Sequence, residues 1–101
     1  MKKIAFDVVT AYESHDDALD ENVRMERTKT FYGEESYQQA LAYYEKRKQA
    51  FDILYQTEEG GLYCRAEMNG KEYTGEYREW VVDETEWKWT GIHLDVRVMN
   101  C

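Results

Sequence analysis

The sequence predicts an α+β domain: an antiparallel sheet of about five strands with one long helix packed on one face. Three features of the chain predict this fold. Apolar residues alternate with polar ones near both ends, an Asn-Gly pair separates two alternating segments, and one central stretch has helical spacing. The element order is strand, strand, helix, strand, strand, strand. Since one helix covers only one face of a sheet, the other face is left to water or to a partner.

The first two predicted strands differ in how well they alternate. In residues 2–12 one face is a row of large apolar side chains with Thr10 as its only gap, which predicts a half-buried strand. That face consists of Ile4, Phe6, Val8 and Tyr12. Residues 22–32 alternate less well, because Arg27 and Lys29 share a face with apolar side chains, so we expect an edge strand. A capping-box-like sequence between the two strands predicts a single helical turn within residues 15–20.

One helix is predicted, over about residues 33–56. Glu34 and Glu35 fall in its first turn, where carboxylates complement the positive end of the helix dipole. Lys48 interrupts a stripe that is otherwise apolar. The stripe consists of Tyr37, Ala40, Leu41, Tyr44, Phe51, Leu54 and Tyr55. Gly60-Gly61 then releases the chain into the next strand.

A tight hairpin is predicted at Asn69-Gly70, because this pair accepts the positive φ angles of a type I′ turn. Counting outward from the turn gives the partner and the face of each residue. The apolar face pairs Ala66 with Tyr73, Cys64 with Gly75, and Leu62 with Tyr77. The register and the hydrophobic pattern agree, which indicates a half-buried hairpin.

The final strand, over about residues 86–99, poses a question of phase. Its inward side chains are Ile92, Leu94, Val96 and Val98, all even-numbered. Trp87 and Trp89 are odd-numbered, so either their rings face away from the core or a β-bulge at Gly91 switches the phase. A glycine at the switch point favours the bulge. The answer decides whether these tryptophans belong to the core or to the surface.

Size and charge limit the function classes. The 101 residues suffice for a single acidic α+β domain, residues 1–101, with one core. The formal charge of −8 disfavours direct binding to nucleic acid, because phosphate contacts need cations. It equally disfavours an anionic membrane surface, and it suits a basic partner protein.

We expect a complete cytoplasmic protein. No apolar run approaches the roughly 20 residues that cross a bilayer, and Asp7 interrupts the apolar stretch that a secretion signal needs. We expect Cys64 and Cys101 to be free thiols, the alternative being a disulfide between them.

No combination of residues in the sequence indicates catalysis. Ser14, His15 and Asp16 are the residue types of a catalytic triad, but adjacent residues cannot form its relay. The acidic stretch around Asp20 lacks the central glycine and the distant glutamate of a calcium loop. We interpret His93 as an outward, solvated side chain. The sequence therefore predicts a protein that is not an enzyme and has no cofactor and no metal ion.

The sequence pattern that does point to a function is the distribution of acidic and aromatic residues. Acidic residues concentrate where the chain turns, and aromatic residues where it is extended. Tyrosine and tryptophan are enriched at the centres of protein interfaces. The hypothesis is a non-enzymatic inhibitor or immunity-type module, of the kind that phages and other mobile elements carry against host defence. Its acidic surface would occupy the basic cleft of a nucleic-acid-handling enzyme. The carboxylates expected to steer binding are Asp16, Asp17, Asp20, Glu21, Asp83, Glu84 and Glu86, and the expected anchors are Trp87, Trp89 and Tyr77.

Two other classes stay open. One is a small-ligand binder or sponge, with an aromatic-lined cleft between helix and sheet. The other is a homo-oligomeric adaptor, such as a homodimer in which the uncovered sheet faces pair with each other.

Overall fold

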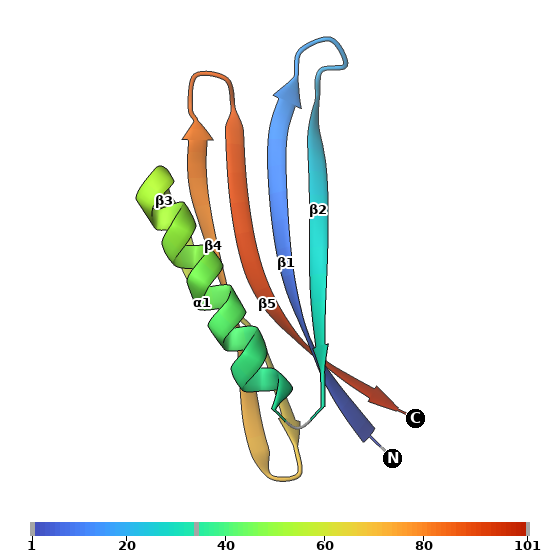
Figure 1. The fold of residues 1–101 in the computed structure, drawn as a ribbon. Helices are drawn as coiled ribbons and strands as arrows, with labels where there is room; N and C mark the ends of the chain where they lie inside the picture. Colours follow the sequence, from blue (N-terminus) through green and yellow to red (C-terminus); the bar gives the residue numbers. More distant parts are fainter. Residues whose placement is uncertain (1, 34, 101) are drawn as a thin grey trace.

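The fold is a five-stranded antiparallel sheet with one helix packed across it, which confirms the predicted fold class and element order (Figure 1). The computed structural model describes residues 2–33 and 35–100. Its elements are β1 (Lys2–Asp16), β2 (Glu21–Tyr32), α1 (Ser36–Leu54), β3 (Gln56–Met68), β4 (Lys71–Asp83) and β5 (Lys88–Asn100). No helix in this part of the chain is long and apolar enough to span a bilayer.

The strand order β2-β1-β5-β4-β3 places the first and last strands side by side at the centre of the sheet. Three hairpins join neighbouring strands, and all pairings are antiparallel. The remaining connection runs from one edge, β2, to the other edge, β3, so α1 must cross the sheet to complete it (Figure 1). The helix therefore covers one face and leaves the second open.

The core lies between α1 and the two central strands. The even-numbered side chains of β1 and β5 face the helix, as their alternation predicts. The buried core residues are Ile4, Phe6, Val8, Ala40, Tyr44, Trp80, Ile92, Leu94 and Val96. Trp80 is fully buried, and its indole Nε1 donates a hydrogen bond to Asp52 of α1 at 2.8 Å. That bond satisfies the one polar atom of the ring and attaches the end of the helix to the sheet.

The ends of the helix differ from the prediction. The helix begins at Ser36, with Glu35 at the N-cap, and the predicted residue Glu34 lies outside the described residues. It stops at Leu54 because Tyr55 adopts an extended conformation. Leu54 is consequently exposed, so its place in the apolar stripe was predicted wrongly. β3 then starts at once, well before the glycines that the sequence suggested as its beginning.

The turn between β1 and β2 is tighter than predicted. β1 continues to Asp16, and residues 17–20 form a turn in place of a helical turn. The Asp16 carboxylate accepts hydrogen bonds from the backbone N–H groups of Ala18 and Leu19, at 2.9 and 3.2 Å. These bonds satisfy the turn locally, as Asp side chains often do.

The predicted register of the β3–β4 hairpin holds near its turn and fails farther out. Ala66 pairs with Tyr73 and Cys64 with Gly75, but an irregularity between Leu62 and Cys64 inserts one residue. Leu62 therefore lies opposite Glu76, and its predicted pairing with Tyr77 is wrong. A β-bulge of this kind changes which face the following residues present.

Gly75 marks the closest approach of backbone to backbone in this region. A Cβ atom at Gly75 would lie 2.0 Å from the Leu94 carbonyl oxygen and 2.6 Å from the Cys64 Sγ. A Cβ at Gly61 would meet only the Tyr77 ring, at 3.5 Å. The first site excludes any side chain, whereas the second has ordinary van der Waals space.

We expect Gly75→Ala to lower the free energy of unfolding by about 3 kcal/mol, because β4 and β5 must separate to admit the methyl group. Urea denaturation followed by circular dichroism measures this loss. Gly61→Ala is the matched control, with an expected change within about 0.5 kcal/mol. Equal effects of the two substitutions would contradict the close packing at Gly75.

Candidate partner-binding surface

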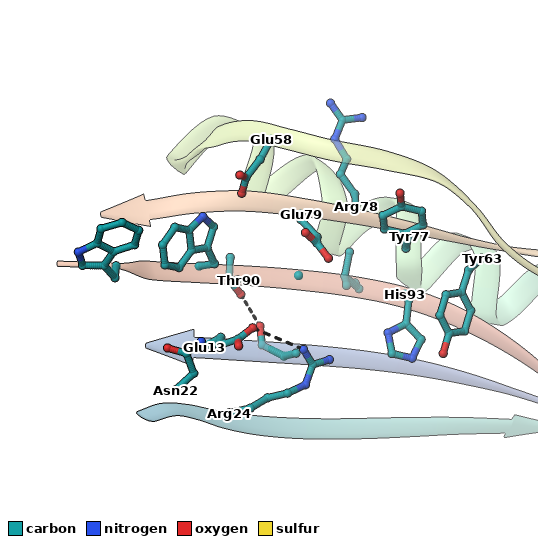
Figure 2. A pocket seen from close by; sticks show the side chains of 15 residues that line it. Glu13, Asn22, Arg24, Glu58, Tyr63, Tyr77, Arg78, Glu79, Thr90 and His93 are labelled. Carbon is teal, nitrogen blue, oxygen red and sulfur yellow. Dashed lines mark hydrogen bonds and ion pairs between the residues drawn. The ribbon is translucent and has the colours of Figure 1, made fainter. Parts of the chain in front are cut away.

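The uncovered face of the sheet is hollowed toward the end that holds the β1–β2 and β4–β5 turns, and Figure 2 shows the side chains around this hollow. Its volume is about 420 Å³. Ala11 of β1 and Gly91 of β5 pair with each other and form part of its floor, where their small size leaves room above the backbone. The aromatic side chains that line it are Tyr63, Tyr77, Trp87, Trp89 and His93. We call this hollow the aromatic trough.

The two C-terminal tryptophans belong to this open face. The β1–β5 register runs without a shift past Gly91, so the bulge favoured at that residue is absent from the pairing. Trp89 therefore keeps the phase of the odd-numbered residues, which face away from α1. Trp87, in the turn before β5, is 61% exposed, and the two ring centroids are 5.8 Å apart. Trp87 and Trp89 therefore belong to the surface and not to the core.

Trp80 faces the opposite way, although it flanks the same turn. It is buried under α1, with its ring centroid 5.1 Å from that of Phe51. Its neighbours across β5 and β3 are Thr90 and Thr57. Of the three tryptophans, one therefore serves the core and two are available on the surface.

The bulge in β3 supplies an aromatic wall that the sequence did not reveal. Tyr63, at the bulge, stacks on His93 with ring centroids 4.4 Å apart. His93 is half-buried as a result, which differs from the solvated side chain predicted for it. Burial lowers the pKa of His93 below its ordinary value of 6.5, because removal from water penalises the charged imidazolium.

Carboxylates concentrate on the β3–β4 side of the trough. Tyr77 donates a hydrogen bond to Glu59 at 2.8 Å, which fixes the tyrosine ring at the rim. Glu79 lines the trough nearby. Burial, followed by the charges of Glu59 and Glu58, raises the pKa of Glu79. Figure 2 shows Glu58, Glu79 and Tyr77 together along this side.

The two acidic turns lie side by side at one end of the sheet (Figure 1). The His15 backbone N–H donates to the Trp87 carbonyl oxygen at 3.3 Å, which joins the turns directly. We call residues 16–21 and 83–88 the acidic tip. It contains seven carboxylates and one lysine, Lys88. This grouping includes all seven carboxylates predicted to steer binding, and Trp87 lies among them.

Not all of these carboxylates have the same role. Like Asp16 in the first turn, Asp83 holds the second turn, accepting hydrogen bonds from the Thr85 hydroxyl and from the backbone N–H groups of Thr85 and Glu86. The Thr85 hydroxyl and these N–H groups lower the pKa of Asp83. Asp17, Asp20, Glu21 and Glu84 are exposed to solvent. They are the carboxylates that a partner would meet first.

Toward the far end of the sheet, the uncovered face carries a polar network in place of rings. The buried Asp7 accepts a hydrogen bond from Thr30 at 2.6 Å and forms an ion pair with Arg97 at 3.2 Å. These contacts satisfy the carboxylate within the protein. The exposed rings and the exposed carboxylates thus share the tip half of this face.

No family model, curated protein or solved structure matches this chain. Within residues 2–33 and 35–100, no three histidine, cysteine, aspartate or glutamate side chains are placed to hold a metal ion.

We expect acid to destabilise the protein through His93. Because its pKa is lower in the folded chain than in the unfolded chain, the unfolded state binds the proton first as the pH falls below 6.5. Stability stops falling once the pH is below the pKa of His93 in the folded chain, because both states then carry the proton. Above pH 6.5 neither state carries it, so His93 does not make stability depend on pH there. Thermal unfolding between about pH 7 and pH 5 measures this dependence.

His93→Phe keeps an aromatic ring against Tyr63 but does not titrate, so its melting temperature should fall less over this pH range. His15→Asn, at the acidic tip, is the matched control and should retain the wild-type dependence. An unchanged dependence in His93→Phe would show that other groups cause the acid sensitivity.

Proposed function

We propose that this protein is a non-enzymatic inhibitor or immunity-type module that docks its acidic tip and aromatic trough into a basic cleft of a partner protein. The observation that carries the proposal is the convergence of two acidic turns beside the exposed Trp87. Charged and aromatic side chains thus lie next to each other on a surface that is not needed for packing the domain. Such a surface combines long-range attraction with a desolvated contact.

The charge distribution favours a particular class of partner. Carboxylates fixed on a rigid hairpin end can occupy the positions that phosphates take in a nucleic-acid-binding cleft. Attraction of this kind accelerates encounter and weakens as salt rises. A nucleic-acid-handling enzyme is therefore the partner class we propose, and a phage or other mobile element that blocks a host defence enzyme is a setting in which such an inhibitor is useful.

The backbone at Trp87 gives separate support. Its φ angle is +56°, in the left-handed region that disfavours side chains with a Cβ. The ring is largely exposed, so burial in the core does not compensate this cost. A non-glycine residue in such a conformation is a reason to suspect a functional role. Contact with a partner would provide one.

Charge reversal at the tip should weaken association selectively. Asp17→Lys combined with Glu84→Lys changes two exposed carboxylates that hold neither turn. We expect an association rate about tenfold lower at low salt, with the difference shrinking as salt screens the charges. The matched control is Glu67→Lys with Glu72→Lys at the opposite hairpin, which changes the net charge equally.

The measurement begins with affinity capture on the immobilised protein, eluted by a salt gradient, and continues with surface plasmon resonance on the purified partner. The partner's nucleic-acid binding or cleavage is then assayed with each variant present. If the tip and control variants bind and inhibit equally well, the acidic tip does not steer docking.

Trp87→Gly should weaken partner binding while leaving the stability of the fold nearly unchanged. Glycine accepts the positive φ angle, so the free energy of unfolding should stay within about 1 kcal/mol of wild type. Loss of an interface anchor should weaken partner affinity at least about tenfold, since such anchors contribute upward of 1–2 kcal/mol. Trp87→Phe is the matched control and should retain most of the affinity. Unchanged affinity in Trp87→Gly would remove Trp87 from the interface.

A small-ligand binder is the second candidate, and the aromatic trough is the observation that favours it. The sequence suggested a cleft between helix and sheet, but the trough lies on the opposite face. A second hollow of about 520 Å³ does lie on the helix side, between Tyr44 and the glycines of β3. Reversal of the tip charges would leave small-ligand binding in either hollow intact, which distinguishes this candidate from the first.

A further inference from the structure

The two edges of the sheet differ in regularity. β3 pairs with β4 through two register shifts, and such irregularities discourage further strands from adding. β2 pairs with β1 in twelve consecutive pairs without a shift, and its other side is an edge of the described sheet. Residues 21–29 of β2 are exposed throughout, including Val23 and Met25. Met25 is 63% exposed.

We propose that β2 pairs antiparallel with β2 of a second copy of this chain, centred on Met25, to form a continuous ten-stranded sheet. The occupant of the edge is thus a second copy. The inference rests on the edge of β2 alone and is independent of the partner proposed above.

Symmetry restricts the possible registers. A two-fold axis between antiparallel copies of one strand stands perpendicular to the sheet, so each copy keeps its helix on the same side. Paired residues must present their side chains on the same face. Residue i therefore pairs with a residue of the same parity, and the axis passes through a residue paired with itself. For an overlap of at least seven residues of β2, that central residue is one of the six from Arg24 to Lys29.

Charge selects one of these six registers. Centring on Arg24, Glu26, Arg27 or Lys29 sets that charge against its own copy, and centring on Thr28 sets Arg27 against Lys29. Like charges directly opposite each other are destabilising. Only the Met25 register, among these six, avoids every such pair.

The Met25 register is also attractive. It pairs Arg24 with Glu26 twice and Glu21 with Lys29 twice, so four opposite-charge pairs form over residues 21–29. Arg24 and Glu26 already interact within one chain at 2.6 Å, and both side chains are about half-exposed, so each can reach the neighbouring strand. At the centre, the two exposed Met25 side chains bury each other. The overlap coincides with the nine residues that are exposed in the single chain.

Charge exchange tests the register. Analytical ultracentrifugation of the wild type should give about twice the 12.1 kDa mass of one chain. Arg24→Glu sets two glutamates opposite each other across the dimer, and Glu26→Arg sets two arginines together, so each single variant should dissociate at least tenfold more readily. An equimolar mixture of the two single variants should recover the dimer, as should the double variant. Circular dichroism confirms that each variant is folded.

The mixture and the double variant are decisive together. Registers centred on Arg24 or Glu26 would also let the mixture complement, but only direct pairing of residue 24 with residue 26 restores the double variant as well. A monomeric wild type, or single variants that stay dimeric, would overturn the proposal. A wild-type dimer whose two single variants fail to complement would overturn this register.

Cross-linking provides a measurement that does not depend on charge. In a Cys101→Ser background, Met25→Cys places two thiols at the symmetry axis, where paired Cα atoms lie about 4.5–5.5 Å apart. Mild oxidation should then give a covalent dimer. Arg27→Cys, two residues along the same strand, is the matched control. Its two thiols would lie four residues apart, about 13 Å along the strands, beyond disulfide reach. Equal or preferential cross-linking at residue 27 would overturn the Met25 register.

Discussion

The structure depends on a mismatch between one helix and a larger sheet. A helix of 19 residues is about 28 Å long, whereas strands of 12–15 residues extend over roughly 40–50 Å. The molecule measures 49 × 29 × 18 Å, so α1 cannot shield the whole length of even one face. The other face has no helix at all among the described elements (Figure 1). The side chains at the tip half of the sheet are exposed because no helix covers them.

The fold places its helix where the apolar residues are densest. The end of α1 is attached at Trp80, whose indole bonds to Asp52, and Asp52 also forms an ion pair with Arg78 at 3.2 Å. Beyond this anchor, β1, β2, β4 and β5 continue to their turns without a covering element. The strands there satisfy their backbone groups by pairing and keep their side chains free. A rigid framework with unused side chains is what a binding surface requires.

Local patterns in the sequence were sufficient for the elements but not for the site. The alternation around Phe6 and Leu94 identified the core face, and Asn69-Gly70 fixed the nearest pairs of its hairpin. The bulge near Tyr63 could not be foreseen, because counting from a turn assumes that no residue is inserted. Gly91 suggested a bulge, but its small size instead leaves room above the floor of the trough. That floor depends on the pairing of Ala11 with Gly91, residues 80 positions apart, which no local pattern reveals.

The central pairing of the first strand with the last has a kinetic consequence. Ile4, Phe6 and Val8 have as their sheet neighbours the side chains of Val98, Val96 and Leu94, so the hydrophobic centre cannot close until β5 has paired with β1. Contacts between such distant parts of a chain require the closure of large loops, which makes folding slower than in proteins built from local contacts. During synthesis, α1 can pack on the β1–β2 hairpin before β5 emerges, but β1 then still lacks its second neighbour. The sheet becomes continuous only when β5 takes its place between β1 and β4.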